Sequence, residues 1–422
     1  MSEKIIEVLA MKKYDAVIVG GCASGMAAAI TAKKRNPKLN IVIIEKLPRL
    51  GKKILATGNG RCNITNLGAS ASDYKNSAFV GKVFEKYTPE KVVDFFGSMG
   101  LLTYADSEGR VYPRSNMAAS VLDALRYEIE GLGIEVICDM PVTQIRKKGD
   151  GFCINGEILC RKLVIATGGK ASPSQGSDGS GYALAKQLGH TVTKLYPALV
   201  PLTVRDNVKP LKGIRARNVE LSLRSDGTVK KTKGELLFTE NGISGIAAME
   251  LASAAEELLD GVKCKTFTDV DFLPEMSSEE LVKYLLNIKN IKGYCSCDML
   301  LAGILPKQLG VEICKAQKLY GQDKKISQLT YADIVRIAEK AKKFTFEICG
   351  TKGFANAQVT SGGVSVGEIN GSTMESRLCR GLFLVGEIVD VDAGCGGYNL
   401  QWAWSSGAIA GKSAAIKISE GK

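Results

Sequence analysis

The stretch VIVGGCASGMAAAI, residues 17–30, decides the fold of this chain. Its apolar start predicts a buried strand ending at Val19, Gly20 predicts a tight turn, and the alanine-rich remainder predicts a helix. Gly25 lets that helix pack closely on the strand, and the N–H groups and dipole at the helix start favour a bound pyrophosphate. The pattern predicts a dinucleotide-binding turn in which Cys22 stands at the middle glycine position of G-x-G-x-x-G.

The next strand strengthens this interpretation. LNIVIIEK, residues 39–46, is a second apolar run that contains Glu45, about 25 residues after Gly20. Strand, turn, helix, strand and acid in this order predict a βαβ unit whose acid hydrogen-bonds a ribose diol. Because an acid at this position disfavours a 2′-phosphate, we expect a nucleotide with a free ribose.

A polar, glycine-rich loop follows in LGKKILATGNGRCNITN, residues 50–66. Its charged, polar and flexible residues are Lys52, Lys53, Gly58, Gly60, Arg61, Asn63 and Thr65. Polar groups packed this densely need hydrogen-bonding partners. We therefore expect the loop to contact a long ligand that runs from the pyrophosphate towards a polar ring.

Two later segments are expected to return to the nucleotide. RKLVIATGG, residues 161–169, reads as a buried strand that closes on paired glycines. GLFLVGEIVDVDAGCGGYNLQWAWSSGAIAG, residues 381–411, reads as an apolar strand, the pair Gly386-Glu387, a Gly396-Gly397 turn and a helix of small residues. The start of that helix offers a second set of polarised N–H groups, suited to an electron-rich ring or a ribityl chain.

Three further residues receive structural interpretations. His190 is the only histidine and follows Gly189 at a predicted helix end, which favours a capping role over proton transfer. Trp402 and Trp404 are two residues apart and do not share one helix face, so we expect one of them in the core.

The chain is long enough for two or three domains, with 422 residues and 45% hydrophobic content. Short β-like runs across residues 191–272 predict a small antiparallel barrel or sandwich. Residues 277–343 read as helical, with Ser277 and Ser278 as cap candidates. The alternating strands and helices of the first part predict a parallel sheet, interrupted by this long insertion. No apolar run is long enough for a membrane helix, and the start of the sequence lacks the pattern of a signal peptide.

Charge and cysteine content limit the alternatives. The net charge of +12 attracts anions, yet no basic run is interleaved with aromatic residues, so a solvated basic surface is favoured and nucleic acid is not an expected partner. The 12 cysteines are scattered, which favours reduced thiols in a cytoplasmic protein. No metal site is expected, because the sequence lacks ligands at zinc spacing. We expect a small-molecule substrate, and the oligomeric state stays open.

Several separated motifs together resemble one family. They are TGNGRCNITN (57–66), GRVYPRSNMAASV (109–121), IATGGKASPSQGSDGSGYALAKQLGH (165–190), PALVPL (197–202), GELLFTENGISG (234–245), VTSGGVSVGEI (359–369) and GEIVDVDAGCGGYNLQWAWSSG (386–407). Across nearly the whole chain these resemble the BaiN-like NAD(P)/FAD-dependent oxidoreductases, also described as aminoacetone-oxidase-like flavoproteins. The resemblance implies an α/β fold: a Rossmann-type FAD-binding domain (1–190 and 355–422), an inserted β-barrel (191–275 and 344–354) and a small helical domain (276–343).

The resemblance also implies FAD as cofactor and NAD(P)H as co-substrate. Matched by motif, the residues expected to hold the cofactor are Gly20, Cys22, Ala23, Ser24, Gly25, Glu45, Lys46, Lys52, Lys53, Thr57, Gly58, Gly60, Arg61, Cys62, Asn63, Thr65, Asn66, Val142, Thr167, Gly168, Gly169, Gly386, Glu387, Gly397, Tyr398, Asn399 and Leu400. Ser24 and its neighbouring glycines would cradle the pyrophosphate, Glu45 and Lys46 would meet the ribose, and Val142 would contact adenine. The chain departs from the family pattern at Cys22, where a third glycine is usual. A thiol at a helix start is expected to have a lowered pKa.

In such a protein the flavin carries out the hydride transfer. The sequence does not identify a catalytic acid or base. The candidate catalytic residues are Arg61, Cys62 and Tyr398. The leading hypothesis is hydride transfer from NAD(P)H to an unsaturated carbonyl, an enone or a steroid-like acceptor. The alternatives are an oxidase of small amino ketones that releases hydrogen peroxide, a flavoprotein acting on tRNA, and a non-catalytic redox sensor.

Overall fold

The computed structural model describes residues 11–225, 227–261, 265–319 and 324–421. Residues up to Leu195 and from Val359 onward form one compact unit, and Tyr196–Gln358 form a second. Within the described residues, no helix is both long enough and apolar enough to cross a membrane.

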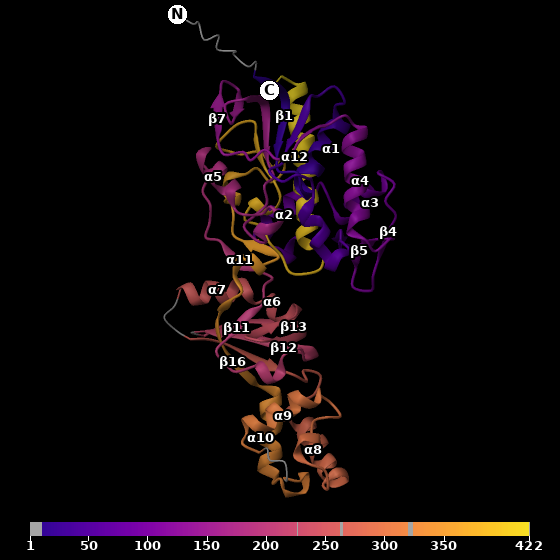
Figure 1. Ribbon diagram of the computed structural model, residues 1–422, viewed down its shortest axis with the longest axis vertical. Coiled ribbons are helices and arrows are strands. Elements are labelled where there is room, and N and C mark those ends of the chain that lie inside the picture. Colours follow the sequence, from indigo (N-terminus) through magenta and orange to yellow (C-terminus); the bar gives the residue numbers. More distant parts are fainter. Residues whose placement is uncertain (1–10, 226, 262–264, 320–323, 422) are drawn as a thin grey trace, which may run out of the picture. The chain divides into compact units, whose positions relative to one another are not determined.

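A seven-stranded sheet organises the first unit, with helices packed beside it (Figure 1). The path of the sheet runs β6 (Glu135–Ile137), β2 (Ile41–Ile44), β1 (Lys12–Val19), β9 (Ile158–Ile165), β8 (Gly151–Ile154) and β7 (Ile145–Lys148), with β18 (Leu382–Leu384) also paired to β9. The pairs β2–β6, β1–β2, β1–β9 and β9–β18 are parallel. The predicted parallel sheet is therefore confirmed for β6, β2, β1, β9 and β18, the last of which the C-terminal segment supplies. Strands β8 and β7 extend the sheet by antiparallel pairs, which the sequence analysis did not predict.

Apolar residues explain where these strands lie. In β2 every residue of the run IVII is buried, and β1 is buried from Ala16 to Val19. Strands covered on both faces read as continuous apolar runs rather than alternating ones. The core of this unit therefore contains the central strands of the sheet.

Small residues allow two helices of this unit to touch at the backbone. The helices of the unit are α1 (Ala23–Arg35), α2 (Ser77–Phe84), α3 (Pro89–Gly97), α4 (Ala118–Gly131), α5 (Ser180–Gln187) and α12 (Tyr398–Ser419). A Cβ built on Gly407 of α12 would lie 2.2 Å from the Ser24 carbonyl oxygen of α1, and one on Gly411 would lie 2.1 Å from that of Ala28. The two helices therefore run in the same direction, in contact.

Both tryptophans of α12 are in the core, so the expectation of a single buried tryptophan is wrong. Trp402 and Trp404 are each at most 1% exposed. Their indole N–H groups donate to the carbonyl oxygens of Gly386 and Ile64, both at 3.0 Å. Buried indoles need such partners. The helix is buried on more than one side, which its spacing alone did not reveal.

A smaller antiparallel sheet of the first unit has the order β3 (Thr65–Asn66), β5 (Arg110–Pro113) and β4 (Thr103–Ala105). The 3₁₀ segment η1 (Lys52–Gly60) precedes it, and the short strand β17 (Val359–Ser361) belongs to the same unit. Two of the motifs that carry the family resemblance, residues 57–66 and 109–121, overlap the strands of this sheet.

The second unit contains a closed barrel of β11 (Leu202–Val204), β14 (Gly242–Ser244), β13 (Thr228–Thr239), β12 (Arg215–Ser225), β15 (Thr266–Asp271) and β16 (Phe344–Thr351). Its other strand is β10 (Tyr196–Ala198), and its described α-helices are α6 (Ile246–Met249), α7 (Ala252–Gly261), α8 (Ser278–Lys292), α9 (Lys307–Ala316), α10 (Tyr331–Lys342) and α11 (Gly353–Asn356). Alternate residues of β15 are buried, as a barrel requires. The predicted fold class, a Rossmann-type domain with an inserted barrel and helices, is confirmed.

The helical segment begins where the sequence predicted. Ser277 caps α8: its hydroxyl accepts from the Glu280 N–H at 3.1 Å, and the Glu280 carboxylate accepts from the Ser277 N–H at 2.8 Å. Thr330 and Asp333 form the same reciprocal cap on α10. Such a capping box satisfies N–H groups that otherwise have no partner.

Candidate functional site

The first glycine turn is built by close backbone contacts. Gly20 has φ +104°, and a Cβ on it would lie 2.4 Å from the Ala166 carbonyl oxygen. A Cβ on Gly25 would lie 1.9 Å from the Gly20 carbonyl oxygen. Both distances are far below a normal contact, so the predicted tight turn and close helix packing are confirmed.

Cys22 is the N-cap of α1 and has an ordinary backbone conformation. Its φ of −107° and ψ of −157° are extended values open to any residue. No side chain caps this helix, and its first turn holds no acidic residue. Beyond the Ala23 N–H, which contacts the Cys22 thiol, the N–H groups of the first turn are therefore available to an anionic ligand. Cysteine replaces glycine here without backbone strain.

The expected reactivity of Cys22 is corrected by its surroundings. Burial raises the pKa of its thiol and outweighs the lowering by the Ala23 N–H and by Lys53. The helix start alone would lower the pKa. Desolvation is the larger effect because the thiol is packed among protein atoms.

Glu45 directly follows β2 and is 8% exposed. Its carboxylate accepts from the Gly21 N–H at 2.8 Å and from the Leu47 N–H at 2.9 Å. The acid therefore braces the first turn, a contact that the sequence did not reveal. The Met140 N–H donates to the Glu45 carbonyl oxygen at 3.0 Å, which brings the segment of Val142 to the end of β2.

Lys46 has a partner that the sequence analysis missed. Its ammonium lies 2.7 Å from the Asp178 carboxylate. Burial by itself raises the pKa of Asp178, but hydrogen bonds from Lys46 and Ser180 lower it to about 2. Asp178 lies in the SDGSG run before α5, and nothing in the spacing connected that run with Lys46.

An ion pair joins the polar loop to the C-terminal segment. The Lys53 ammonium lies 2.8 Å from the Glu387 carboxylate, which also accepts from the Thr360 N–H at 2.9 Å. A Cβ on Gly169 would lie 2.8 Å from that carboxylate and 2.4 Å from the Thr360 hydroxyl. The loop, the paired glycines and the Gly386-Glu387 pair therefore meet in one place. Lys52 lies beside them and donates to the Ser174 carbonyl oxygen.

The loop before β3 has an unusual backbone. Positive φ angles occur at Gly58, Asn59, Gly60 and Cys62. The Thr57 hydroxyl donates to the Ile54 carbonyl oxygen at 2.7 Å, and a Cβ on Gly58 would lie 2.8 Å from the Asn63 nitrogen. Cys62 is fully buried, and burial raises the pKa of its thiol to about 12. It is therefore a neutral thiol at pH 7.

The second glycine turn packs against β3. Gly397 has φ +101°, and a Cβ on it would lie 2.6 Å from the Thr65 carbonyl carbon. The Asn66 amide donates to the Gly396 carbonyl oxygen at 3.2 Å, and the Thr65 hydroxyl lies 2.5 Å from the Gln401 amide oxygen. Gln401 was not predicted; it is fully buried one turn into α12. Like α1, helix α12 has no side-chain cap and no acid in its first turn.

The residues after this turn are fixed by local contacts. The Asn399 amide bonds the backbone of Ala393 in both directions, at 2.8 and 3.0 Å. The Tyr398 carbonyl oxygen accepts from the Tyr74 hydroxyl at 2.8 Å, and the two rings meet edge to face. Leu400 packs against the core of the unit.

Thr167 and Gly168 lie at the end of β9, beside α5. A Cβ on Gly181 of α5 would lie 1.8 Å from the Thr167 hydroxyl oxygen. Within the described residues this buried hydroxyl has no hydrogen-bond partner. Gly168 has φ +73°, a left-handed turn that glycine favours.

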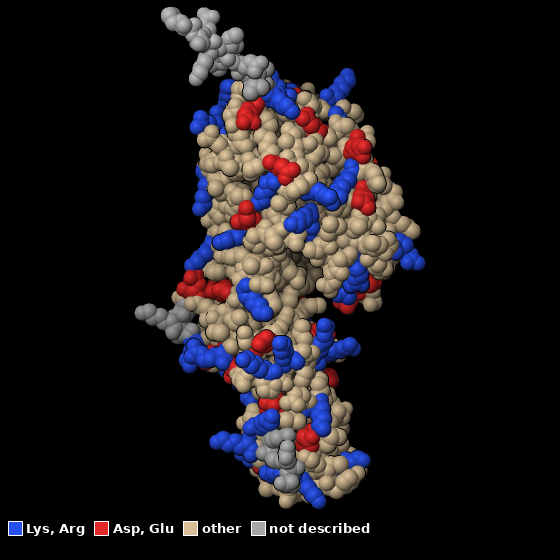
Figure 2. Space-filling view, in the orientation of Figure 1, with Lys and Arg blue, Asp and Glu red and all other residues tan. Residues whose placement is uncertain are grey.

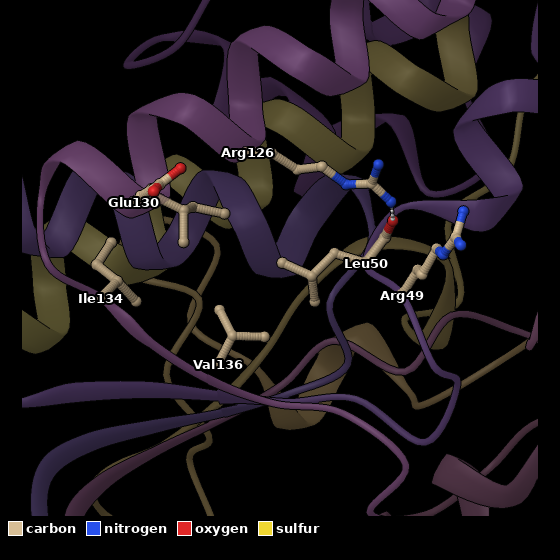
Figure 3. Close-up of a pocket in the computed structure, with 7 residues that line it drawn as sticks. Arg49, Leu50, Arg126, Glu130, Ile134 and Val136 are labelled. Carbon is tan, nitrogen blue, oxygen red and sulfur yellow. Dashed lines mark hydrogen bonds between the residues drawn. The ribbon is translucent and has the colours of Figure 1, made fainter.

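A cavity of about 490 Å³ lies near the first turn but is a different feature (Figure 3). Arg49, Leu50, Arg126, Ile129, Glu130, Ile134 and Val136 line it. The Arg126 guanidinium donates to the Leu50 carbonyl oxygen at 2.6 Å. None of the residues predicted to hold the cofactor lines this cavity.

His190 combines a capping role with a side-chain network. Its backbone N–H donates to the Ala185 carbonyl oxygen at 3.1 Å, which closes the end of α5 as expected. Its imidazole lies 3.0 Å from Glu368 and 2.9 Å from the Ser376 hydroxyl. Burial lowers the pKa of His190, although Glu368 raises it in part. None of these contacts includes a residue predicted to hold the cofactor.

Together, the parallel sheet and the two uncapped helix starts at glycine turns define a protein of the Rossmann-type dinucleotide-binding class. The chain belongs to the HI0933-like family: the model described as "HI0933-like protein Rossmann domain" matches residues 14–413. The predicted membership of the BaiN-like flavoprotein family is confirmed.

Two curated relatives and one solved structure illustrate this family and fold. The chain is 38% identical to a 3-dehydro-bile acid delta(4,6)-reductase of Clostridium scindens, over 94% of this chain and 98% of the relative. It is 31% identical to a ribosomal RNA dihydrouridine synthase of Escherichia coli, over 94% of this chain and 96% of the relative. The structure of a 3-ketosteroid delta1-dehydrogenase from Sterolibacterium denitrificans aligns with a TM-score of 0.53 and 13% identity, covering 96% of this chain and 100% of that one. This last likeness concerns the fold alone.

Proposed function

We propose that this chain is an FAD-dependent oxidoreductase that takes a hydride from NAD(P)H and reduces a carbon–carbon double bond conjugated to a carbonyl group. The net reaction consumes one NAD(P)H and one proton, and it gives NAD(P)⁺ and the saturated carbonyl compound. A small enone or a steroid-like acceptor is the leading substrate class.

The observation that carries the proposal is the relation between the two uncapped helix starts. Helices α1 and α12 run in the same direction, with Gly407 against Ser24. Because α12 begins nine residues before Gly407, its start lies about 14 Å beyond that contact, at 1.5 Å per residue. Two anion-attracting helix ends separated in this way suit an elongated dinucleotide, with the pyrophosphate at α1 and the flavin ring towards α12.

The residues around these ends fit FAD. Gly20, Ser24 and Gly25 would hold the pyrophosphate, with Glu45 bracing the turn beside the ribose. The loop from Thr57 to Asn66 and the turn at Gly397 would hold the flavin end. When bound, the flavin supplies the hydride chemistry. The chain's own residues bind and orient the reactants, and Arg61 and Tyr398 are the candidates for contact with substrate.

The names of the two relatives support this reaction type. A delta(4,6)-reductase of a 3-dehydro bile acid and a dihydrouridine synthase both add two hydrogens to a double bond conjugated with a carbonyl. The second name supports a second candidate substrate, a uridine in ribosomal RNA, and thereby favours ribosomal RNA over tRNA among the RNA alternatives. Lys and Arg side chains are spread over the visible surface, with acidic residues among them (Figure 2).

Anaerobic stopped-flow reduction of the purified protein tests the proposal. We expect a yellow protein that releases FAD on denaturation and is bleached by NADH or NADPH. Reoxidation is then followed with a 3-oxo-Δ4,6 bile acid, a uridine-containing ribosomal RNA fragment, and oxygen with aminoacetone. Peroxide formation matching loss of the amino ketone would support the oxidase instead, and a colourless protein would refute the proposal.

A further inference from the structure

One motif of the family resemblance, GRVYPRSN at 109–116, lies beside the proposed flavin end, with residues 111–113 buried and residues 114–116 exposed. Strand β5 carries it, between β3 and β4. Thr65 of β3 pairs with Val111, and Asn66 pairs with Arg110. Because Thr65 and Asn66 also contact the second glycine turn, this sheet connects the motif to the proposed flavin end.

Two tyrosines form an aromatic pair on this sheet. Tyr104 and Tyr112 are directly opposite each other on β4 and β5, so their side chains share one face. Their ring centroids are 6.0 Å apart, with 33° between the planes. The Tyr104 hydroxyl donates to the Asn116 amide oxygen at 2.6 Å. The orientation of the pair is therefore fixed before any ligand arrives.

Arg61 lies on one ring of this pair, that of Tyr112. Its guanidinium carbon is 4.6 Å from the centroid of the Tyr112 ring, a cation–π contact. The left-handed residues Gly58, Gly60 and Cys62 shape the loop around it, with Cys62 buried and Arg61 exposed. Strained backbone of this kind is retained where the surrounding structure enforces it, often at ligand sites.

Arg110, on strand β5 of this sheet, has acidic partners that Arg61 lacks among the described residues. Arg110 is neutralised by Asp106 at 2.8 Å and by Glu108 at 2.7 Å. Within the described part of the chain, no carboxylate lies within ion-pairing distance of Arg61. Its planar guanidinium therefore keeps donors available for a carboxylate or a phosphate oxygen, which it binds through two parallel hydrogen bonds.

We infer that Arg61, held on the Tyr112 ring, is a binding site for an anionic group of the substrate. The group is a carboxylate or a phosphodiester, and the buried Tyr112 ring, 4% exposed, supports the guanidinium that binds it. The inference rests on the proposed function and adds a substrate class to it: an acceptor that carries a negative charge apart from its conjugated carbonyl. Arg61 is thereby a substrate-positioning residue.

Calorimetric titration of the purified holoprotein tests this site without requiring turnover. One pair of ligands is a saturated 3-oxo bile acid and its methyl ester, which differ in the negative charge and in one methyl group. A second pair is a uridine-containing RNA oligonucleotide and the neutral nucleoside uridine. We expect the wild type to bind at least one anionic member more tightly than its neutral partner, and that member identifies carboxylate or phosphodiester.

The variants then assign the preference to Arg61. In Arg61→Ala the dissociation constant of the preferred anion should rise at least tenfold, while that of its neutral partner changes less than twofold. Arg61→Lys keeps the charge and should recover part of the loss. Tyr112→Leu removes the ring beneath the guanidinium and should weaken anion binding severalfold. Arg146→Ala, an exposed arginine of β7, is the matched control and should leave both constants unchanged.

Two results would overturn the site. One is equal weakening of anionic and neutral ligands in Arg61→Ala, and the other is a wild type that binds no anion more tightly than its neutral partner. Flavin content and bleaching by NAD(P)H are measured on the same samples. Loss of these in the wild type would refute the proposed function, whereas their retention with no charge preference would refute the anion site alone.

Discussion

The two glycine turns of the first unit look alike in sequence but differ in what they tolerate. Each enters a helix without a side-chain cap and without an acid in the first turn. At the first turn the N-cap is Cys22, with φ −107°; at the second it is Gly397, with φ +101°. The backbone at the first N-cap position does not require glycine, whereas the positive φ and the close contact at the second favour glycine.

The difference has a physical origin in what lies behind each turn. Gly397 has the backbone of Thr65 at 2.6 Å from where its Cβ would be, so both conformation and space exclude a side chain. At the first turn this close packing is at Gly20 and Gly25, on either side of Cys22. The positions of a glycine motif therefore differ in how strictly they require glycine. Cys22 stands at a position whose backbone conformation is open to other residues.

Gly397→Ala is the largest expected effect. A left-handed alanine costs about 1–2 kcal/mol, and the overlap with Thr65 adds a cost of similar size, so we expect a loss of about 3 kcal/mol in the free energy of unfolding. Urea denaturation measures the loss, and absorbance measures flavin per polypeptide, which should fall. Gly133→Ala is the control: its φ is +63° but nothing lies within 4 Å of the added Cβ, so it should lose only about 1 kcal/mol. Equal losses would contradict the role of Thr65.

Lys53→Ala tests the ion pair that joins the polar loop to the C-terminal segment leading to the second turn. Lys53 and Glu387 are about four-fifths buried, with side-chain exposures of 20% and 21%. Removing the lysine leaves Glu387 poorly paired, and we expect a loss of about 1–2 kcal/mol. The control is Lys12→Ala, whose pair with Glu135 is exposed and should contribute less than about 0.5 kcal/mol. If the two variants had the same urea midpoint, the ion pair of Lys53 and Glu387 would be no stronger than a surface ion pair.

The sequence predicted local elements better than the contacts between distant ones. The strand ending at Val19, the turn at Gly20 and the cap at Ser277 follow from periodicity and cap chemistry, which act over a few residues. The return of residues 382–384 to the sheet was also predictable, because a short continuous apolar run is typical of a strand buried in a parallel sheet.

Contacts that depend on tertiary packing were not predictable. Asp178 meets Lys46 across 132 positions, and Thr360 meets Glu387 at the end of an insertion. No spacing rule connects such residues. The prediction of a lowered pKa for the Cys22 thiol was wrong for the same reason. The sequence shows the helix start, which lowers the pKa, but not the burial, which raises it by more.

Cys22→Gly restores the usual motif and should have a small effect. Since the backbone of Cys22 is unstrained, glycine relieves nothing and only increases the freedom of the unfolded chain. We expect the free energy of unfolding to fall by less than about 1 kcal/mol and FAD affinity to change less than about threefold, by calorimetry on reconstituted apoprotein. FAD binding more than tenfold tighter in Cys22→Gly would show that the thiol crowds the pyrophosphate. In the native wild type, iodoacetamide should label Cys22 slowly at pH 7, because burial raises the pKa of the thiol.

Asp178→Asn is the smallest expected effect and is confined to one range of pH. In the folded protein the pKa of Asp178 is about 2, below its ordinary value of 3.8, so its ionised form stabilises the fold above about pH 4. As pH falls from 4 to 2 the carboxylate is protonated and that stability is lost. The side chain is 47% exposed, so the contribution is less than about 1 kcal/mol. Urea unfolding should show the variant slightly less stable than the wild type at pH 7, with the difference vanishing near pH 2. Asp123→Asn, an exposed position of α4, is the control and should follow the wild type throughout. A difference that persisted at pH 2 would mean that Asp178 acts through packing rather than through its charge on Lys46.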